Sequence, residues 1–212
     1  MFSNKKEKQT KVELLSTLTK DSELFNSFVT LQNEINVAHN TKVIAITSVE
    51  NDRLAAALGK ALATTYSLNG SKSLLIDANM YNPCLSYVIG EAKEDSISVF
   101  EGANKEVELK HEKTALNEYL DAVCFDKEVY PGNVFKSKVI QDMIKKEANK
   151  YEHFIILVPS IRSHKEVELL SDVVESIVLV AQKDFTKKKD IYEAISFFKE
   201  RQLPLAKTVL VQ

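Results

Sequence analysis

Short apolar runs of strand length alternate along this chain with longer segments of helical periodicity. The run HFIILV at residues 153–158 is almost continuously apolar, which is typical of a parallel strand covered on both faces. Strands that alternate with helices in this way indicate βαβ units. Because the crossovers of such units are right-handed, helices cover both faces of the sheet. The sequence therefore predicts the α/β class, as a three-layer αβα sandwich with a mostly parallel central sheet and an additional N-terminal helix.

The same patterns place the expected elements along the chain. Strands are predicted at residues 42–47, 72–77, 118–125, 153–158, 176–181 and 207–211. Helices are predicted at residues 23–39, 52–68, 83–88, 94–101, 136–149, 165–171 and 187–201. Residues 1–20 are polar and are expected to form a flexible tail, so that residues 21–212 form a single domain.

Composition excludes several classes of protein. The 212 residues carry a net charge of −2, so bulk electrostatics does not favour nucleic acid. No apolar run is long enough to span a membrane, and the charged N-terminus lacks the apolar stretch of a signal peptide. Cys84 and Cys124 form no CxxC pair, and the four histidines are scattered, so no metal site is expected. These features predict a cytoplasmic protein that binds no nucleic acid.

Three segments follow predicted strands at the edge of the sheet where ligands bind in α/β proteins, namely residues 47–53, 77–83 and 157–162. The first begins the sequence TSVENDRLAAALGKALA, in which a strand end, a turn and a helix follow one another. A phosphate-binding turn at such a position needs glycines and a lysine. This turn has neither, and the chain has only five glycines, about a third of average usage.

The three segments resemble sequence blocks of the cytoplasmic bacterial tyrosine kinases of capsule and exopolysaccharide synthesis, which belong to the MinD/ParA-like P-loop ATPases. The family blocks read approximately ITSxxPGEGKST, VLLIDADLRRPxL and YDxIIIDTPP, whereas this chain reads AITSVENDRLAAALGKALA, SLLIDANMYNPCL and YEHFIILVPSI. Weaker likenesses join SISVFEG, at residues 96–102, to GLSDVLSG, and PGNVFKSKVIQDMI, at residues 131–144, to PPNPSELLSSKRMKELL. The resemblance covers about residues 21–212 and implies a P-loop NTPase-like fold.

The resemblance also implies that the phosphate-binding residues of the first block are replaced here. Asp52 and Leu54 stand where the family has loop glycines, and Ala55 stands where its lysine meets the phosphates. Ala56 and Ala57 replace the hydroxyl residues, one of which would hold Mg²⁺. The degenerate loop comprises Ser48, Asn51, Asp52, Arg53, Leu54, Ala55 and Ala56. No catalytic, nucleotide-binding or metal-ligating residue is expected in it.

The second and third blocks are altered as well. Asp77 is retained, but Asn79 stands where a second aspartate acts in the family, and the arginine pair after it has become Tyr81-Asn82. Leu157 replaces the aspartate that organises the metal. The vestigial positions are therefore Asp77, Asn79 and Leu157. An ordinary turn explains Asp77 and Asn79 better than a remnant acidic site does.

Other positions give weaker signals. The self-association motif of the family, E-x-x-R-x-x-R, would fall on Glu23, Asn26 and Val29, where only the glutamate remains. The tyrosine cluster at the family's C-terminus has no counterpart in this sequence. Arg162 and His164, beyond the third block, could contact an anion, although a solvated loop is the preferred interpretation.

Together the substitutions remove the chemistry of a phosphate site. Ala55 lacks the charge of lysine, Asp52 places a carboxylate near the phosphate position, and Leu157 cannot bind a metal. Each such loss typically costs about one to several kcal/mol in a charge-clamped site. Asn51 or Asp52 can instead cap the helix that follows, whose alanine-rich start favours helix formation. We therefore expect no Mg–ATP site of the usual kind.

These features favour a non-catalytic, pseudokinase-like protein that binds partners or regulates polysaccharide assembly. The resemblance implies that its partner is the cytoplasmic tail of a membrane chain-length or adaptor protein, or an active paralogue, with or without recruitment to the inner face of the cell membrane. Two alternatives stay open at this point. One is a divergent ATP-dependent tyrosine kinase or ATPase with a rewired site, which alone would need ATP and Mg²⁺. The other is an interaction domain unrelated to polysaccharide.

Overall fold

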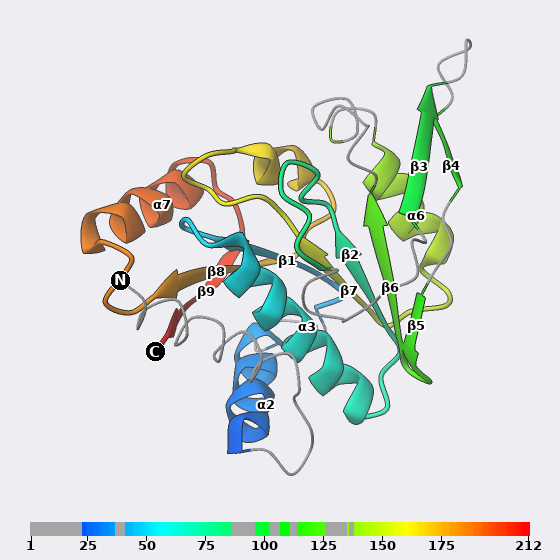
Figure 1. Ribbon diagram of the computed structural model, residues 1–212, viewed down its shortest axis with the longest axis horizontal. Coiled ribbons are helices and arrows are strands. Elements are labelled where there is room, and N and C mark those ends of the chain that lie inside the picture. The colour runs from blue at the N-terminus through cyan, green and yellow to red at the C-terminus, as the bar shows by residue number, and fades with distance from the viewer. Residues whose placement is uncertain are drawn as a thin grey trace, which may run out of the picture.

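A mostly parallel β-sheet forms the centre of the fold (Figure 1). The structure, a computed structural model, describes residues 23–36, 41–85, 96–101, 107–110, 114–125, 135 and 138–212. Its strands are β1 (Val43–Ser48), β2 (Ser73–Asp77), β3 (Ser96–Glu101), β4 (Val107–Lys110), β5 (Thr114–Asn117), β6 (Leu120–Phe125), β7 (His153–Leu157), β8 (Ser176–Gln182) and β9 (Leu205–Val211). Within the described residues these nine strands form one sheet, in the order β4-β3-β6-β2-β7-β1-β8-β9 with β5 paired to β6.

The pairing directions match the predicted class. Across the described part of the sheet, seven neighbouring strands from β3 to β9 pair in parallel, while β4 runs antiparallel to β3 and β5 antiparallel to β6. β7 lies between β1 and β2, so that Ile46 and Asp77 both pair with Leu157. The carboxyl ends of these three strands therefore meet at one edge of the sheet.

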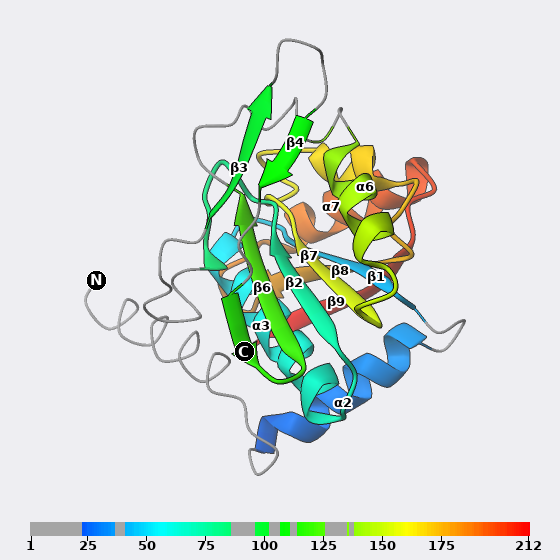
Figure 2. The same ribbon diagram turned by 90° about the vertical axis from the view of Figure 1, so that its right-hand side faces the viewer.

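Helices cover both faces of this sheet (Figure 2). The described helices are α2 (Glu23–Asn36), α3 (Asp52–Leu68), α6 (Val139–Glu147), α7 (Lys188–Glu200) and the 3₁₀ helix η1 (Glu166–Leu170). α2 and α3 pack on the face that carries Ile44 and Ile46 of β1. α6, η1 and α7 pack on the other face, which carries Val43 and Ala45. Successive residues of β1 point to opposite faces of the sheet, so these two sets of helices cover opposite faces. Helices, sheet and helices therefore form the predicted three-layer sandwich.

Most predicted elements are confirmed to within a few residues. The helix predicted at 52–68 has the bounds of α3, and α2 confirms residues 23–36 of the first predicted helix. The helix predicted at 165–171 is the 3₁₀ helix η1, whereas β4 and β5 are strands that the sequence did not predict. The tail at residues 1–20 and residues 86–88 of the predicted helix at 83–88 lie outside the described residues.

The helix predicted at residues 94–101 is wrong, because residues 96–101 form the strand β3. Its first residues, Ser96 and Ile97, pair in parallel with β6, and the rest of the strand pairs antiparallel with β4. The segment SISVFE is rich in β-branched and aromatic residues, which favour strands. In a run this short, periodicity does not separate strand from helix, so pairing with β6 decides the outcome.

Candidate functional site

The three segments that follow β1, β2 and β7 meet at the carboxyl edge of the sheet, as the sequence predicted. The backbone N–H of Ala78, after β2, donates to the carbonyl of Leu157 at 2.9 Å. The hydroxyl of Thr47, near the end of β1, donates to the carbonyl of Pro159 at 2.7 Å. These bonds hold the segments in register at the place where α/β proteins bind ligands.

The start of α3 is capped by the side chain of Asn51. Its Oδ1 atom accepts a hydrogen bond from the backbone N–H of Leu54 at 3.2 Å, and its carbonyl accepts one from the N–H of Ala55 at 3.1 Å. Its Nδ2 atom donates to Oε1 of Gln182, at the end of β8, at 3.1 Å. Of the two capping residues considered in the sequence, Asn51 is therefore the one that caps the helix.

Asp52 instead joins all three segments. One carboxylate oxygen, Oδ1, accepts the backbone N–H of Ser160 at 2.9 Å, and the other, Oδ2, accepts the side-chain amide of Asn82 at 3.3 Å. Ser160 follows β7 and is only 5% exposed, and Asn82 follows β2. A carboxylate of this chain therefore occupies a hydrogen-bond donor from each of the two neighbouring segments at this edge.

The backbone after β1 does not adopt the conformation of a glycine-rich loop. Only residues 49–51 separate β1 from α3, and among the described residues positive φ angles occur at Lys138, Asp184, Gln202 and Gly70, none of which belongs to this turn. α3 already begins at Asp52, ahead of the Ala55 position. From Leu54 onward, the apolar residues of α3 are buried in the core that this helix forms with α2 and the sheet. Arg53 lies exposed on the first turn of this helix.

Leu157, which the resemblance aligns with an aspartate that organises the metal, is packed into the core. It is 3% exposed and belongs to the cluster that includes α3. A Cβ atom at Gly59 of α3 would overlap Cδ2 of Leu157 and would lie 3.4 Å from Cδ1 of Ile46. The leucine side chain therefore fills the space between β7 and α3 at Gly59. Ser48, which ends β1, is likewise buried, and its carbonyl accepts the N–H of Ile161 at 2.9 Å.

Asp77 holds the turn after β2. Its Oδ1 accepts the backbone N–H of Asn79 at 3.0 Å, and its Oδ2 accepts those of Cys84 and Leu85, each at 2.8 Å. Burial raises the pKa of the Asp77 carboxyl to about 6, although the three hydrogen bonds oppose this shift and the nearby charge of Asp52 adds to it. This residue fastens the loop that follows β2, as the turn interpretation of the sequence expected.

The residues that replace the family's second aspartate and arginine pair also stabilise this loop. Oδ1 of Asn79 accepts the backbone N–H of Asn82 at 3.1 Å. The Tyr81 hydroxyl donates to Oε1 of Glu166 in η1 at 2.5 Å, and its ring stacks on His164 with the centroids 3.7 Å apart. The loop is therefore joined to the segment after β7 through an aromatic pair.

Acidic side chains surround the start of α3. Arg162 donates from Nη1 to Glu50 at 2.8 Å and to Asp190 of α7 at 3.2 Å. Its side chain is 55% exposed, in keeping with the expected solvated loop, but its charge is held between two acids. Among the side chains named at this edge, the acids Glu50, Asp52, Asp77 and Asp190 outnumber the cations Arg53 and Arg162.

A Mg–nucleotide site of the usual kind uses an ammonium group, a hydroxyl and a carboxylate to hold phosphate and metal. At the positions that the resemblance aligns with these groups, this chain carries the methyl groups of Ala55 and Ala56 and the isobutyl group of Leu157. Among the described residues no group of three or more histidine, cysteine, aspartate or glutamate side chains could hold a metal ion. Nor does any described helix have the length and apolarity to cross a membrane.

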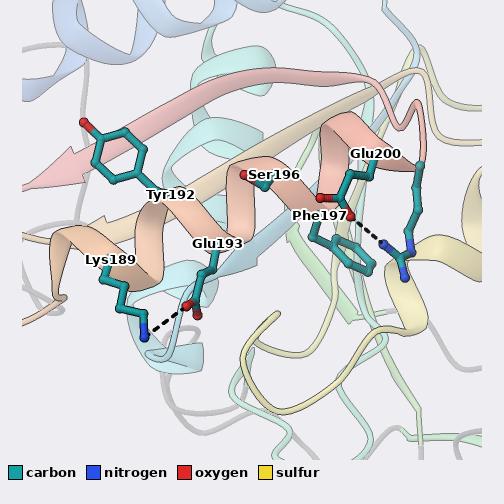
Figure 3. Close-up of a pocket in the computed structure, with 7 residues that line it drawn as sticks. Lys189, Tyr192, Glu193, Ser196, Phe197 and Glu200 are labelled. Atoms are coloured by element: carbon teal, nitrogen blue, oxygen red, sulfur yellow. Dashed lines mark ion pairs between the residues drawn. The ribbon is translucent and has the colours of Figure 1, made fainter.

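A shallow surface groove lies elsewhere, along α7 (Figure 3). It is lined by Lys189, Tyr192, Glu193, Ser196, Phe197, Glu200 and Arg201. Ion pairs join Lys189 to Glu193 at 3.5 Å and Arg201 to Glu200 at 3.8 Å. All these residues come from α7 and the residue that follows it, so the groove is separate from the edge at which β1, β2 and β7 end.

Several residues that complete this edge were not found from the sequence. They are Ser160, Gln182, Glu166 and Asp190, which contact residues 28 to 131 positions away in the chain. Their partners follow from how the sheet brings distant segments together, and no local pattern marks them. The rule that ligand sites follow the carboxyl ends of strands did locate the segment that contains Ser160.

The strand order and the strand–turn–helix after β1 define a P-loop NTPase-like fold. No protein-family model matches the chain, and no curated protein matches it. Solved structures do. The kinase domain of Escherichia coli tyrosine kinase ETK superposes with a TM-score of 0.76 at 14% identity, over 88% of this chain and 74% of that one.

Two further structures show the same fold. The kinase domain of VpsO matches with a TM-score of 0.74 at 16% identity, over 100% of this chain and 99% of that one. A ParA family ATPase from Chlorobium tepidum matches with a TM-score of 0.62 at 13% identity, over 81% and 73%. The expected structural similarity to tyrosine kinase domains and ParA-like ATPases is therefore confirmed at the level of the fold.

Proposed function

We propose that this chain is a non-catalytic relative of the tyrosine kinases of capsule and exopolysaccharide synthesis and acts by binding protein partners. The observation that carries this proposal is the carboxylate of Asp52, which accepts the Ser160 N–H and the Asn82 amide at the edge where a nucleotide would bind. The fold shared with kinase domains supports the relationship.

Electrostatics supports the loss of nucleotide binding. Two like unit charges about 4 Å apart repel by about 4 kcal/mol at an effective dielectric constant of about 20. A phosphate at the start of α3 would lie beside the Asp52 carboxylate, and no lysine at position 55 would offset that repulsion. Displacing Asp52 would also leave the buried Ser160 N–H without its acceptor, at a cost of about 1–3 kcal/mol.

The partner is proposed from the resemblance. A catalytically silent domain with this fold can still present its surface to the cytoplasmic tail of a membrane chain-length or adaptor protein, or to an active kinase paralogue. The extensive hydrogen bonding at the carboxyl edge supports a scaffold whose shape does not depend on nucleotide. Binding of such a partner is therefore expected to be independent of ATP.

Affinity capture from native cells tests this function. The full chain, carrying an affinity tag, is incubated with detergent-solubilised membranes and with cytosol, each with and without Mg–ATP. We expect a membrane protein of polysaccharide assembly, or a tyrosine kinase paralogue, to be recovered in equal yield under both conditions. Recovery that requires Mg–ATP, or phosphate transfer from ATP by the purified chain, would contradict the proposal and favour a divergent kinase. Specific partners with no link to polysaccharide would instead favour the repurposed interaction domain.

A further inference from the structure

The outer edge of β9 has no role in the proposed function. β9 stands at the end of the sheet order and, among the described strands, pairs only with β8. We infer that a second copy of this chain pairs its own β9 antiparallel to this edge, around a two-fold axis at Val209. This self-association does not depend on whether the chain binds nucleotide.

The backbone groups that point away from the sheet follow from the pairing with β8. The N–H of Lys183 donates to the carbonyl of Val211 at 2.9 Å, so the carbonyl of Val211 faces β8. In a parallel ladder the N–H and C=O groups of successive residues alternate between the two sides of the strand. Val209 therefore also faces β8, while Thr208 and Leu210 direct their N–H and C=O groups outward.

These outward groups suit an antiparallel copy of the same strand. With the axis at Val209, Thr208 of one copy lies opposite Leu210 of the other, and each such pair exchanges both of its N–H···O bonds. The two Val209 residues face each other as a non-hydrogen-bonded pair, with Cα atoms about 4.5 Å apart. Lys207 lies opposite Val211, so the two lysines do not face each other.

From Lys207 to Val211, β9 has few of the devices that usually protect an edge strand, which are charges, prolines and bulges. Its sequence, LAKTVLV, has a single charged residue, Lys207, whose Nζ atom lies 2.8 Å from a carboxylate oxygen of Glu34 in α2. The irregularity in its pairing with β8 falls at Ala206, so residues 207–211 pair in regular register. Leu210 is 52% exposed although it is a leucine in a strand. A second β9 would cover this side chain and satisfy the outward backbone groups.

Sedimentation equilibrium of the full chain tests the inference. We expect the apparent mass to rise from 23.9 kDa towards twice that value as the protein concentration is raised. Leu210→Lys should keep the mass at one copy at all concentrations, because it places a charge at the paired edge. Leu169→Lys is the matched control, since Leu169 is also an exposed leucine, 39% exposed, but lies on η1. It should self-associate as the unmodified chain does.

A single copy at every concentration for the unmodified chain would overturn the inference, as would self-association of Leu210→Lys equal to that of the unmodified chain. Either result would mean that another segment covers the edge or that the association uses another surface.

Disulfide cross-linking tests the register. Cysteines form a disulfide when their Cα atoms are about 4.4–6.8 Å apart, a range that includes the expected separation of the two Val209 residues. Under mild oxidation Val209→Cys should give a covalent dimer, whereas Leu210→Cys should not, although Leu210 is the more exposed position. Equal yields, or a higher yield for Leu210→Cys, would overturn the two-fold pairing at Val209.

Discussion

At the scale of single residues, the Asp52 carboxylate is the feature on which the proposed loss of phosphate binding rests. A glycine at this position, as in the family pattern, has no side chain and leaves the neighbouring backbone N–H groups free for a ligand. The Asp52 carboxylate instead accepts a buried N–H from the segment after β7 and an amide from the loop after β2. The side chain thus adds a negative charge at this edge and joins the start of α3 to the two neighbouring segments.

Asp52→Ala is expected to lower the free energy of unfolding by about 1–3 kcal/mol, because it leaves the buried Ser160 N–H without an acceptor. Asp52→Asn is the matched control, since its side-chain oxygen can still accept that bond. It should lose clearly less stability than the alanine variant. Urea unfolding at neutral pH measures both changes. Equal stability of Asp52→Ala and the unmodified chain would show that the carboxylate does not hold these segments together.

The raised pKa of Asp77 predicts that the stability of the folded protein depends on pH. Burial raises its pKa from the ordinary value of 3.8 to about 6, so between these values the folded protein holds the proton more tightly than the unfolded chain does. The contribution of the Asp77 carboxyl to the free energy of unfolding is therefore fully present below the pKa of the unfolded chain. It is lost as the pH rises through about 6, the pKa in the folded protein. Urea unfolding across this range should show the loss, and Asp77→Asn, which has no titrating group, should show a flatter profile.

A direct titration of the Asp77 carboxyl provides the decisive check of this prediction. The side-chain carbon of Asp77, followed by NMR against pH, should titrate with a midpoint near 6. A midpoint at or below the ordinary 3.8 would mean that the three backbone N–H bonds outweigh burial. The pH-dependent loss of stability would then have to come from other groups.

At the scale of elements, the contact between α3 and β7 depends on Gly59. A methyl group at this position would overlap Leu157 of β7, so Gly59→Ala is expected to destabilise the fold by about 1–3 kcal/mol, although alanine is the better helix former. Thermal or urea unfolding measures the change. A stabilised Gly59→Ala variant would show that helix and strand are not in close contact there.

Leu157→Ala supplies the control for that prediction. The single variant removes buried apolar volume and should cost about 2–5 kcal/mol. In the double variant Gly59→Ala/Leu157→Ala the added methyl group occupies part of the space left by the leucine. The loss should therefore be smaller than the sum of the two single losses by about 1 kcal/mol. Strict additivity would contradict a direct contact between the two side chains.

The elements that sequence predicted well are those with long and strongly periodic patterns. α3, of 17 residues, combines an apolar face with a capping asparagine, so both its type and its bounds could be predicted. β3 could not, because its short run fits either structure and its pairing with β6 depends on a segment more than 20 residues away. β4 and β5, of four residues each, are too short to give a periodic signal.

At the scale of the whole molecule, the sequence predicted which segments meet at the carboxyl edge of the sheet better than it predicted the bonds between them. The alternation of strands and helices was sufficient to bring the ends of β1, β2 and β7 together. The particular bonds were not predictable, since Asp52 and Ser160 are 108 residues apart and Arg162 and Glu50 are 112 apart. Such pairs follow from strand order, which a single sequence does not record locally.

The central claim is that the edge beside α3 does not bind nucleotide. Isothermal titration of the full chain with Mg–ATP tests it directly, with an ATP-binding kinase domain of the same fold as the positive control. We predict no saturable heat in the titration and, in thermal unfolding with Mg–ATP, no rise in Tm. A ligand present at about 100 times its Kd would instead stabilise the folded state by about 2.7 kcal/mol. A one-to-one binding isotherm that excess ADP abolishes would contradict this claim. It would show that phosphate displaces the Asp52 side chain from its hydrogen bonds.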